Sequence, residues 1–228
     1  MSDSGVVVVE RNLLGTTDLF APLPPEVLEG LRAQATVRTL ARNEWLFLKG
    51  DESDALYVID EGRVAIATQS GDGRETVLAV LEDGALFGEL PLFDDAPRSA
   101  DVRALADTTL IELGYEPVRQ VLRERPELLW VIVRLVVQRL RATDEALADA
   151  VFLDVPARTA KRLLDMAGND DRFTLPVTQE ELAAIVGASR ERVNKAISLF
   201  VRLGWLEIEG RSSYRILDRE ALQDRATI

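Results

Sequence analysis

The hydrophobic pattern of the chain changes its period near Tyr115, and this change limits the folds that the chain can adopt. From about Thr39 to Leu113, short apolar or alternating runs are separated by glycine-containing turns. Many short strands at such spacing are typical of a small antiparallel barrel or jelly roll. Beyond Tyr115, apolar residues recur about every 3.6 positions, which predicts helices. We therefore expect an α+β protein in which a β jelly roll is followed by helices. The predicted strands are residues 45–48, 55–59, 63–68, 76–81, 85–87, 99–104 and 108–113, and a helix that includes residues 25–31 precedes them.

The chain of 228 residues contains no cysteine and no histidine, which removes several kinds of chemistry. Disulfides, Cys/His zinc sites, cysteine-ligated iron–sulfur clusters and haem held by His or Cys all need the missing side chains. Catalysis by a Ser, Cys or Thr nucleophile with a histidine base is excluded as well. A Walker A sequence is also absent. We expect neither enzymatic activity nor a metal site.

The chain has no stretch of about 18 apolar residues, so the sequence predicts no transmembrane helix. The apolar run at residues 6–9 is too short for the core of a signal peptide. We expect a soluble, cytoplasmic protein that makes no membrane contact.

Residues 126–152 are expected to form one helix on the order of 40 Å long, at 1.5 Å per residue. Alternating steps of four and three residues separate its seam positions, as in a two-stranded coiled coil. This pattern favours a homodimer formed through residues 126–152; the alternative is a helix that lies on its own β domain. The seam positions are Leu129, Val133, Val136, Leu140, Thr143, Leu147 and Ala150.

A hinge-like break at residues 154–156 separates the long helix from a second helix at 157–167. We therefore expect three parts: a first domain at residues 1–125, a dimerisation helix at 126–153 and a second domain at 154–228.

Residues 178–204 predict a helix-turn-helix. Thr178 and Glu181 have the spacing of a capping box at the start of a short helix. Gly187 stands where a left-handed residue would end that helix, and Ser189 can cap the next one. Two helices joined by a short glycine-containing turn form this motif, and the segments 205–209 and 213–217 have the form of a wing hairpin.

The outer face of the second helix carries the residue types that base edges require, because Arg and Lys donate to guanine and Glu accepts from cytosine. The alternative is a charged face that is merely solvated. The residues on this face are Arg190, Glu191, Asn194, Lys195 and Ser198, with Arg192 beside them as a candidate phosphate contact.

The net charge of −12 argues against a nucleic-acid partner until the charge is divided along the chain. Residues 1–154 contain 15 Lys+Arg and 28 Asp+Glu, a formal charge of −13, whereas residues 155–228 contain 12 and 11, a formal charge of +1. The acidity therefore belongs to the first domain and the long helix. Residues 154–228, which carry the helix-turn-helix and form the predicted DNA-binding domain, are nearly neutral.

A second motif suits a ligand that carries both phosphate and sugar. Gly88 permits close backbone approach, and the amides that begin a short helix after it attract an anion. Arg98 and Ser99 can donate to phosphate oxygens, and Glu89 can accept from a sugar hydroxyl. The alternative is a surface salt bridge. We expect Arg98→Leu to abolish effector binding without disturbing the fold.

Two segments of the chain are Phe-Leu-Asp-Val-Pro-Ala-Arg at 152–158 and Thr-Gln-Glu-Glu-Leu-Ala-Ala-Ile-Val-Gly-Ala-Ser-Arg-Glu-Arg-Val-Asn-Lys at 178–195. Together they resemble the DNA-binding end of the CRP/FNR family of bacterial transcription regulators. The resemblance extends over residues 19–217. It implies that a homodimer binds double-stranded DNA at a palindrome with TGTGA-like half-sites. The implied base contacts are Arg190, Glu191 and Lys195, and the implied phosphate contacts are Thr178, Gln179 and Ser189.

The same resemblance identifies residues 87–100 as similar to the phosphate-binding cassette of cyclic-nucleotide-binding domains. It implies cyclic AMP as the effector and RNA polymerase as a partner. Because His and Cys are absent, the branches of the family that use iron–sulfur clusters or haem are excluded. Three alternatives stay open: cyclic GMP or another effector, effector-independent DNA binding, and a cyclic-nucleotide-binding regulatory subunit that does not contact DNA. The implied ligand residues are Gly88, Glu89, Leu90, Arg98, Ser99, Arg139, Thr143 and Asp144, and the last three are implied to lie on the base side of the nucleotide. Residues 1–125 are therefore the predicted effector domain.

Overall fold

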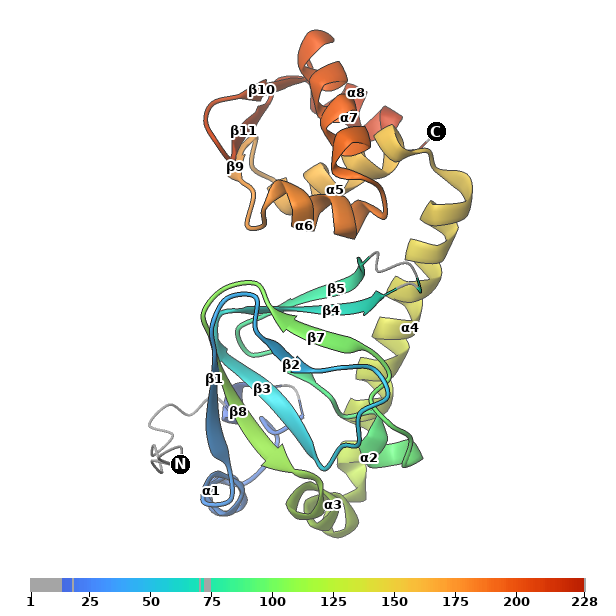
Figure 1. Ribbon diagram of the computed structural model, residues 1–228. Coiled ribbons are helices and arrows are strands. Elements are labelled where there is room, and N and C mark those ends of the chain that lie inside the picture. The colour runs from blue at the N-terminus through green and yellow to red at the C-terminus, as the bar shows by residue number, and fades with distance from the viewer. Residues whose placement is uncertain (1–13, 18, 70, 72–74, 228) are drawn as a thin grey trace. The chain divides into compact units, whose positions relative to one another are not determined.

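The computed structural model describes residues 14–17, 19–69, 71 and 75–227, and it is drawn in Figure 1. The apolar run at residues 6–9, interpreted from its sequence as too short for the core of a signal peptide, lies outside the described residues. The chain divides into two compact units, one made of residues 1–73 and 78–139 and the other of residues 74–77 and 140–228.

Two four-stranded sheets form the β-rich part of the chain, with strand orders β1-β8-β3-β6 and β2-β7-β4-β5. Buried side chains from both sheets, among them Leu40, Ile59, Val64, Val102 and Leu110, make one core between them. This is the double-sheet arrangement of a jelly roll, as the sequence predicts. The strands are β1 (Thr36–Leu40), β2 (Trp45–Phe47), β3 (Ala55–Glu61), β4 (Arg63–Gln69), β5 (Glu75–Glu82), β6 (Leu86–Phe87), β7 (Asp101–Ala104) and β8 (Thr108–Gly114).

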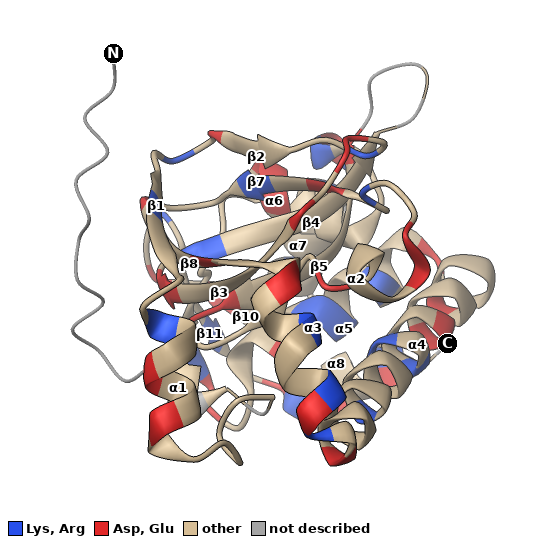
Figure 2. Ribbon diagram, turned by 90° about the horizontal axis from the view of Figure 1, so that it is seen from below, with Lys and Arg blue, Asp and Glu red and all other residues tan. Residues whose placement is uncertain are grey.

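A second hydrophobic cluster explains why β3 is apolar at every position from Ala55 to Ile59, all of which are buried. Strand β3 belongs to the sheet of order β1-β8-β3-β6, and helices cover the face of that sheet that points away from the jelly-roll core. Phe20 and Leu31 pack there with Leu56 of β3 and Val118 of the helix that follows β8. The helical segments of this unit are η1 (Leu14–Thr16), α1 (Pro25–Arg32), α2 (Pro91–Asp94), α3 (Tyr115–Glu124) and η2 (Pro126–Leu128). Figure 2 shows acidic positions on α1 and α3.

The long helix α4 (Leu129–Phe152) confirms the predicted helix, although residues 126–128 form a 3₁₀ turn before it. An unusual number of large apolar side chains on α4 are exposed; Trp130 is 74% exposed and Phe152 is 80% exposed. Exposed apolar surface of this extent marks an interaction face. The exposed apolar residues of α4 are Leu129, Trp130, Val133, Val136, Val137, Leu140, Leu147, Val151 and Phe152.

The second unit contains a three-helix core and a small sheet of order β10-β11-β9. Leu163 of α5, Leu182 of α6 and Phe200 of α7 are fully buried. The hairpin of β10 and β11 is the predicted wing, shortened by one or two residues at its ends. The elements are α5 (Val155–Ala167), β9 (Arg172–Thr174), α6 (Gln179–Val186), α7 (Arg190–Arg202), β10 (Leu206–Ile208), β11 (Ser213–Ile216) and α8 (Arg219–Arg225).

Helix α5 begins two residues before its predicted start. The Asp154 carboxylate accepts from the Ala157 amide at 2.9 Å, and Pro156 lies in the first turn, where its missing N–H costs nothing. The predicted break at 154–156 is therefore reduced to Leu153 and the capping residue Asp154, and helix follows at once.

None of the helices in the described part of the chain is both long enough and apolar enough to span a membrane.

Candidate nucleotide and DNA sites

Arg98 lies at the centre of the predicted nucleotide site and is 5% exposed. Its Nη1 donates to the Gly88 carbonyl at 3.0 Å and to the Tyr115 hydroxyl at 3.2 Å, and its Nη2 donates to the Ala55 carbonyl at 2.8 Å. The guanidinium also lies 4.1 Å from the centre of the Phe47 ring, a cation–π contact. Arg98 is therefore held in one orientation by the backbone of the jelly roll.

Glu89 is buried and forms an ion pair with Arg139 of α4. Arg139 also donates to the Leu86 carbonyl, which fixes its guanidinium beside the cassette. The structure thus brings together four of the predicted ligand residues, namely Gly88, Glu89, Arg98 and Arg139. The resemblance associated Arg139 with the base of the nucleotide, whereas the structure places it on Glu89, the candidate sugar contact.

Two buried polar atoms of this site have no hydrogen-bond partner among the described residues: Oε2 of Glu89 and Nε of Arg98. A buried polar atom without a partner costs about 1–3 kcal/mol. One atom accepts and the other donates, so the pair suits a ligand that offers a hydroxyl and an anionic oxygen. The ribose and phosphate of a cyclic nucleotide offer these two groups.

The other predicted ligand residues lie at the surface. Leu90 and Ser99 are exposed at the two ends of the cassette. Thr143 and Asp144 are exposed on the part of α4 that belongs to the second compact unit. A cleft of about 680 Å³ borders Pro91 and Tyr115, but none of the eight predicted ligand residues lines it.

Tyr115 was not predicted as a site residue, yet its hydroxyl donates to the Gly88 carbonyl at 2.6 Å and accepts from Arg98. Burial raises the pKa of the Tyr115 hydroxyl, so it remains a donor at neutral pH. The change of hydrophobic period at Tyr115 marks the end of the strands, but it does not indicate this contact.

Replacing Gly88 by alanine tests how closely the cassette backbone approaches Arg98. Gly88 has φ of +75°, and a Cβ there would lie 2.8 Å from Nη1 of Arg98. We expect Gly88→Ala to displace Arg98 and to weaken cyclic-nucleotide binding at least about tenfold, or about 1.4 kcal/mol, measured by calorimetry. Gly84→Ala is the matched control, because Gly84 has φ of +81° with open space around it. Equal affinity in both variants would contradict the crowding argument.

The helix-turn-helix has the caps that the sequence predicts. The Thr178 hydroxyl accepts from the Glu181 amide at 3.2 Å, and the Glu181 carboxylate accepts from the Thr178 amide at 2.6 Å. Gly187 is left-handed with φ of +69°, and the Ser189 hydroxyl accepts from the Arg192 amide at 3.4 Å. The capping box fixes the start of α6, Gly187 fixes its end, and Ser189 fixes the start of α7.

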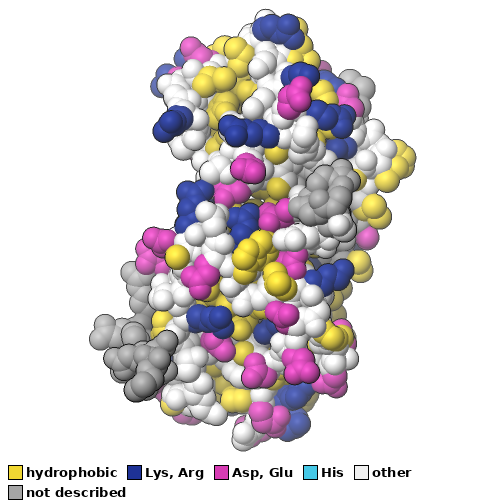
Figure 3. Space-filling view, viewed as in Figure 1, with side chains coloured by type: hydrophobic (Ala, Val, Ile, Leu, Met, Phe, Trp, Pro, Cys, Tyr) yellow, Lys and Arg dark blue, Asp and Glu magenta, His cyan; other side chains and the backbone are white. Residues whose placement is uncertain are grey.

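The predicted base-contacting residues form the exposed face of α7. Arg190, Glu191, Arg192 and Lys195 are all exposed, whereas the opposite face is buried. Glu191 and Lys195 pair at 2.6 Å, and the hydrogen bond from Lys195 lowers the pKa of the Glu191 carboxyl. Basic side chains also lie over the region of α7 and β9–β11 in Figure 3. The face can therefore present donors and a charged acceptor together.

Gln179 differs from the other predicted phosphate contacts because its side chain is directed into the protein. Its Nε2 donates to the hydroxyl of Tyr214 on β11. Tyr214 is buried and stacks on Phe173 with ring centres 5.8 Å apart. In this structure, Gln179 joins the start of α6 to the wing, a tertiary contact that no local sequence pattern indicates.

Two family models match the chain. The model described as "Cyclic nucleotide-binding domain" matches residues 37–125, and the "Crp-like helix-turn-helix domain" matches residues 157–225. A CRP-like cAMP-activated global transcriptional regulator of Mycobacterium tuberculosis is 36% identical over 221 residues, covering 94% of this chain and 98% of the relative. The cAMP-activated global transcriptional regulator CRP of Escherichia coli O157:H7 is 30% identical and covers 85% and 96%.

A solved structure is also similar over most of its length. It is the c-di-GMP responsive global regulator CLP of Xanthomonas campestris, with a TM-score of 0.75, 26% identity, and coverage of 85% of this chain and 99% of that one.

These matches, together with the jelly roll and the capped helix-turn-helix, define a ligand-controlled DNA-binding protein. The chain belongs to the CRP/FNR family of transcription regulators. It is a DNA-binding regulator that responds to a cyclic nucleotide, and its relatives are regulators and not enzymes.

Proposed function

We propose that the chain acts as a homodimeric regulator that cyclic AMP switches to a form with high affinity for a palindromic, TGTGA-like DNA site. The observation that carries the proposal is the pair of unpartnered buried atoms, Glu89 Oε2 and Arg98 Nε. They match the sugar hydroxyl and the phosphate of a cyclic nucleotide. We assign residues 1–125 to effector binding, 126–153 to dimerisation and 154–228 to DNA binding.

The choice of adenine rests on Thr143 and Asp144. A hydroxyl and a carboxylate accept hydrogen bonds from an exocyclic amine, which adenine carries. Guanine also carries an amine, so cyclic GMP is the comparison that tests the assignment. Leu90 and Ser99 complete the proposed ligand set on the phosphate side.

Dimerisation through α4 is supported by its exposed apolar residues, which a second copy would cover. A homodimer with two α7 helices would bind half-sites about 34 Å apart, one turn of DNA. On each half-site, Arg190, Glu191 and Lys195 would contact bases, while Thr178, Ser189 and Arg192 would contact phosphates. Gln179 would contact phosphate only after its side chain leaves the Tyr214 hydroxyl. RNA polymerase is the proposed partner at the promoter, and the cytoplasm, which holds the DNA, is the proposed location.

A second candidate effector is cyclic di-GMP, because the Xanthomonas campestris regulator of similar structure is described as responsive to it. The two effectors differ in size and in the number of phosphates. Titration of both, with cyclic GMP, into the same protein separates these possibilities.

Selection of DNA sequences by the purified protein, with and without cyclic AMP, tests the proposal. We expect palindromic TGTGA-like sites to be enriched only when cyclic AMP is present, and sedimentation to give the mass of a dimer. No heat on titration with cyclic AMP, together with unchanged DNA affinity, would contradict control by cyclic AMP. Enrichment of the same sites without any ligand would favour effector-independent binding.

A further inference from the structure

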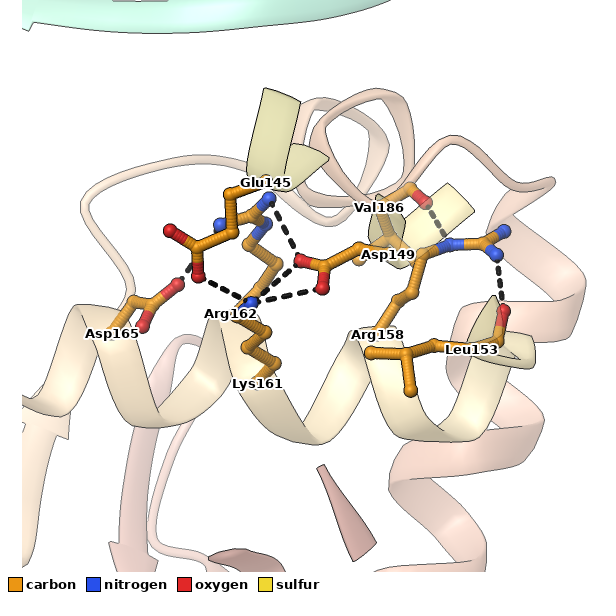
Figure 4. A network of polar contacts seen from close by, with 8 residues as sticks. All are labelled: Glu145, Asp149, Leu153, Arg158, Lys161, Arg162, Asp165 and Val186. Atoms are coloured by element: carbon orange, nitrogen blue, oxygen red, sulfur yellow. Dashed lines mark hydrogen bonds and ion pairs between the residues drawn. The ribbon is translucent and has the colours of Figure 1, made fainter. Parts of the chain in front are cut away.

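Charged residues join the last turns of α4 to α5 within the second compact unit (Figure 4). Lys161 of α5 donates to Glu145 at 2.7 Å and to Asp149 at 2.9 Å, and both carboxylates belong to α4. Arg162 lies 3.8 Å from Asp149 and pairs with Asp165 of its own helix at 3.0 Å. Lys161 and Arg162 thus contact the same carboxylate of α4 from neighbouring positions of α5.

Asp149 is the member of this network on which the contact depends most, because it is only 8% exposed. Burial opposes the charge of Lys161, but its hydrogen bonds to Asp149 and Glu145 raise the pKa of Lys161. Glu145 is exposed, and an ion pair at the surface contributes little. Removing Lys161 would leave the buried carboxylate of Asp149 with only the more distant Arg162, which is unfavourable.

Arg158 and Asp154 make further contacts at the break between α4 and α5. Arg158 of α5 donates to the Leu153 carbonyl at the end of α4 at 2.6 Å, and its Nε donates to the Val186 carbonyl at the end of α6 at 2.9 Å. Asp154 caps α5 and pairs with Arg225 of α8 at 2.6 Å. The sequence predicts a hinge-like break here, whereas the structure fixes it by contacts on both sides.

We propose that Asp149 and Lys161 are positioning residues for DNA recognition, because their ion pair sets the direction in which α5 leaves α4. Helix α5 packs directly against the recognition helix α7 and, through Arg158, holds the end of α6. We call the ion pair between Asp149 and Lys161 the α4–α5 joint. The orientation of α7 relative to the last turns of α4 then follows from this joint. The inference rests on the proposed dimer, since it concerns how two α7 helices are presented to one palindrome.

The joint has a measurable consequence for the spacing between half-sites. Two recognition helices held rigidly on a dimer fit half-sites at one separation and one rotation about the DNA axis. If the joint loosens, each α7 can adjust independently. Such a protein binds the preferred palindrome more weakly and tolerates a changed spacer better, although its base contacts are intact.

Lys161→Met tests the joint, because methionine keeps most of the apolar stem and removes the charge. DNA affinity is measured for the selected palindrome and for versions with two base pairs added to or removed from the spacer. We expect the wild-type protein to lose at least about tenfold in affinity, about 1.4 kcal/mol, on the altered spacers, and Lys161→Met to lose about threefold or less. Preference for the bases of each half-site stays the same.

Asp165→Asn is the matched control, since it breaks an ion pair of the same network that lies within α5 alone. It keeps the wild-type spacing dependence. The exchanged pair, Asp149→Lys with Lys161→Asp, restores at least part of that dependence. A Lys161→Met protein with the full wild-type dependence, or an exchanged pair without recovery, overturns the proposal.

Hydrogen exchange of the backbone amides of residues 150–158 is measured in the ligand-free protein. This measurement tests the joint without depending on DNA binding or on the effector. We expect faster exchange there in Lys161→Met than in Asp165→Asn. If the wild-type protein shows no spacing preference, the proposed dimer on a palindrome fails, and unchanged exchange in Lys161→Met then overturns the joint itself.

Discussion

Arg98→Leu is expected to abolish binding of cyclic nucleotides and also to destabilise the jelly roll. The variant removes the proposed cation of the phosphate site, and a charge-assisted bond to phosphate has no substitute in leucine. It also leaves the Ala55 carbonyl without the donor that contacts it at 2.8 Å. A buried acceptor that loses its partner costs about 1–3 kcal/mol. Calorimetry with cyclic AMP and thermal unfolding of the same protein measure the two effects.

This result differs from the expectation drawn from the sequence, in which Arg98→Leu leaves the fold intact. The sequence identifies Arg98 only as a ligand residue, whereas the structure shows it bonded to two carbonyls and the Tyr115 hydroxyl. Two control variants separate the roles. Ser99→Ala removes an exposed candidate donor and should weaken binding at little cost in stability. Tyr115→Phe removes a bond to Gly88 and should lower stability more than it affects binding. Unchanged affinity in Arg98→Leu would mean that the nucleotide binds elsewhere.

Glu191→Ala is expected to relax sequence preference at one base pair of each half-site by about 1–3 kcal/mol. Glu191 is exposed on the first turn of α7, and its carboxylate pairs with Lys195 at 2.6 Å. Loss of the carboxylate removes the acceptor for cytosine and frees Lys195 from its ionic partner. Affinity for all sequences can therefore rise slightly while discrimination falls. Binding to a set of singly substituted palindromes measures both quantities.

Glu180→Ala is a suitable control for this experiment, since Glu180 is an exposed acid in the first turn of α6 and lies outside the predicted base contacts. It changes the net charge by the same amount and should alter non-specific affinity alone. If Glu191→Ala shifts the affinity for every sequence equally, as this control does, Glu191 does not contact a base.

Local signals in the sequence predicted the elements that carry their own start and stop residues. The capping box of Thr178 and Glu181, the left-handed Gly187 and the Ser189 cap define α6 and α7 without reference to the rest of the molecule. The same is true of the strands between glycine turns, which short apolar or alternating runs indicate without reference to the rest of the molecule. Elements that depend on distant partners were not predicted. β1 is an edge strand with one buried residue, β9 is three residues long, and α8 buries only Leu222.

The residues of the candidate sites also divide into those that a local pattern indicates and those that only distant contacts place. Residue types and spacing predicted that Gly88, Glu89 and Arg98 form a phosphate and sugar site, because a short cassette supplies all three. Nothing in the spacing indicated that Arg139, fifty residues further on, pairs with Glu89. The contact of Gln179 with Tyr214 on the wing likewise joins residues that are far apart in the chain.

The sequence by itself determined the fold class, the order of the parts, the helix caps and the kinds of chemistry that a chain without histidine or cysteine can perform. These follow from periodicity and composition, which act over a few neighbouring residues. Only the tertiary structure decided how Arg98 is held, which cation meets Glu89, and that Lys161 ties α5 to Asp149 of α4. Each of these is a charged group withdrawn from water, and its partner is chosen by which elements pack together and not by the residues beside it in the chain.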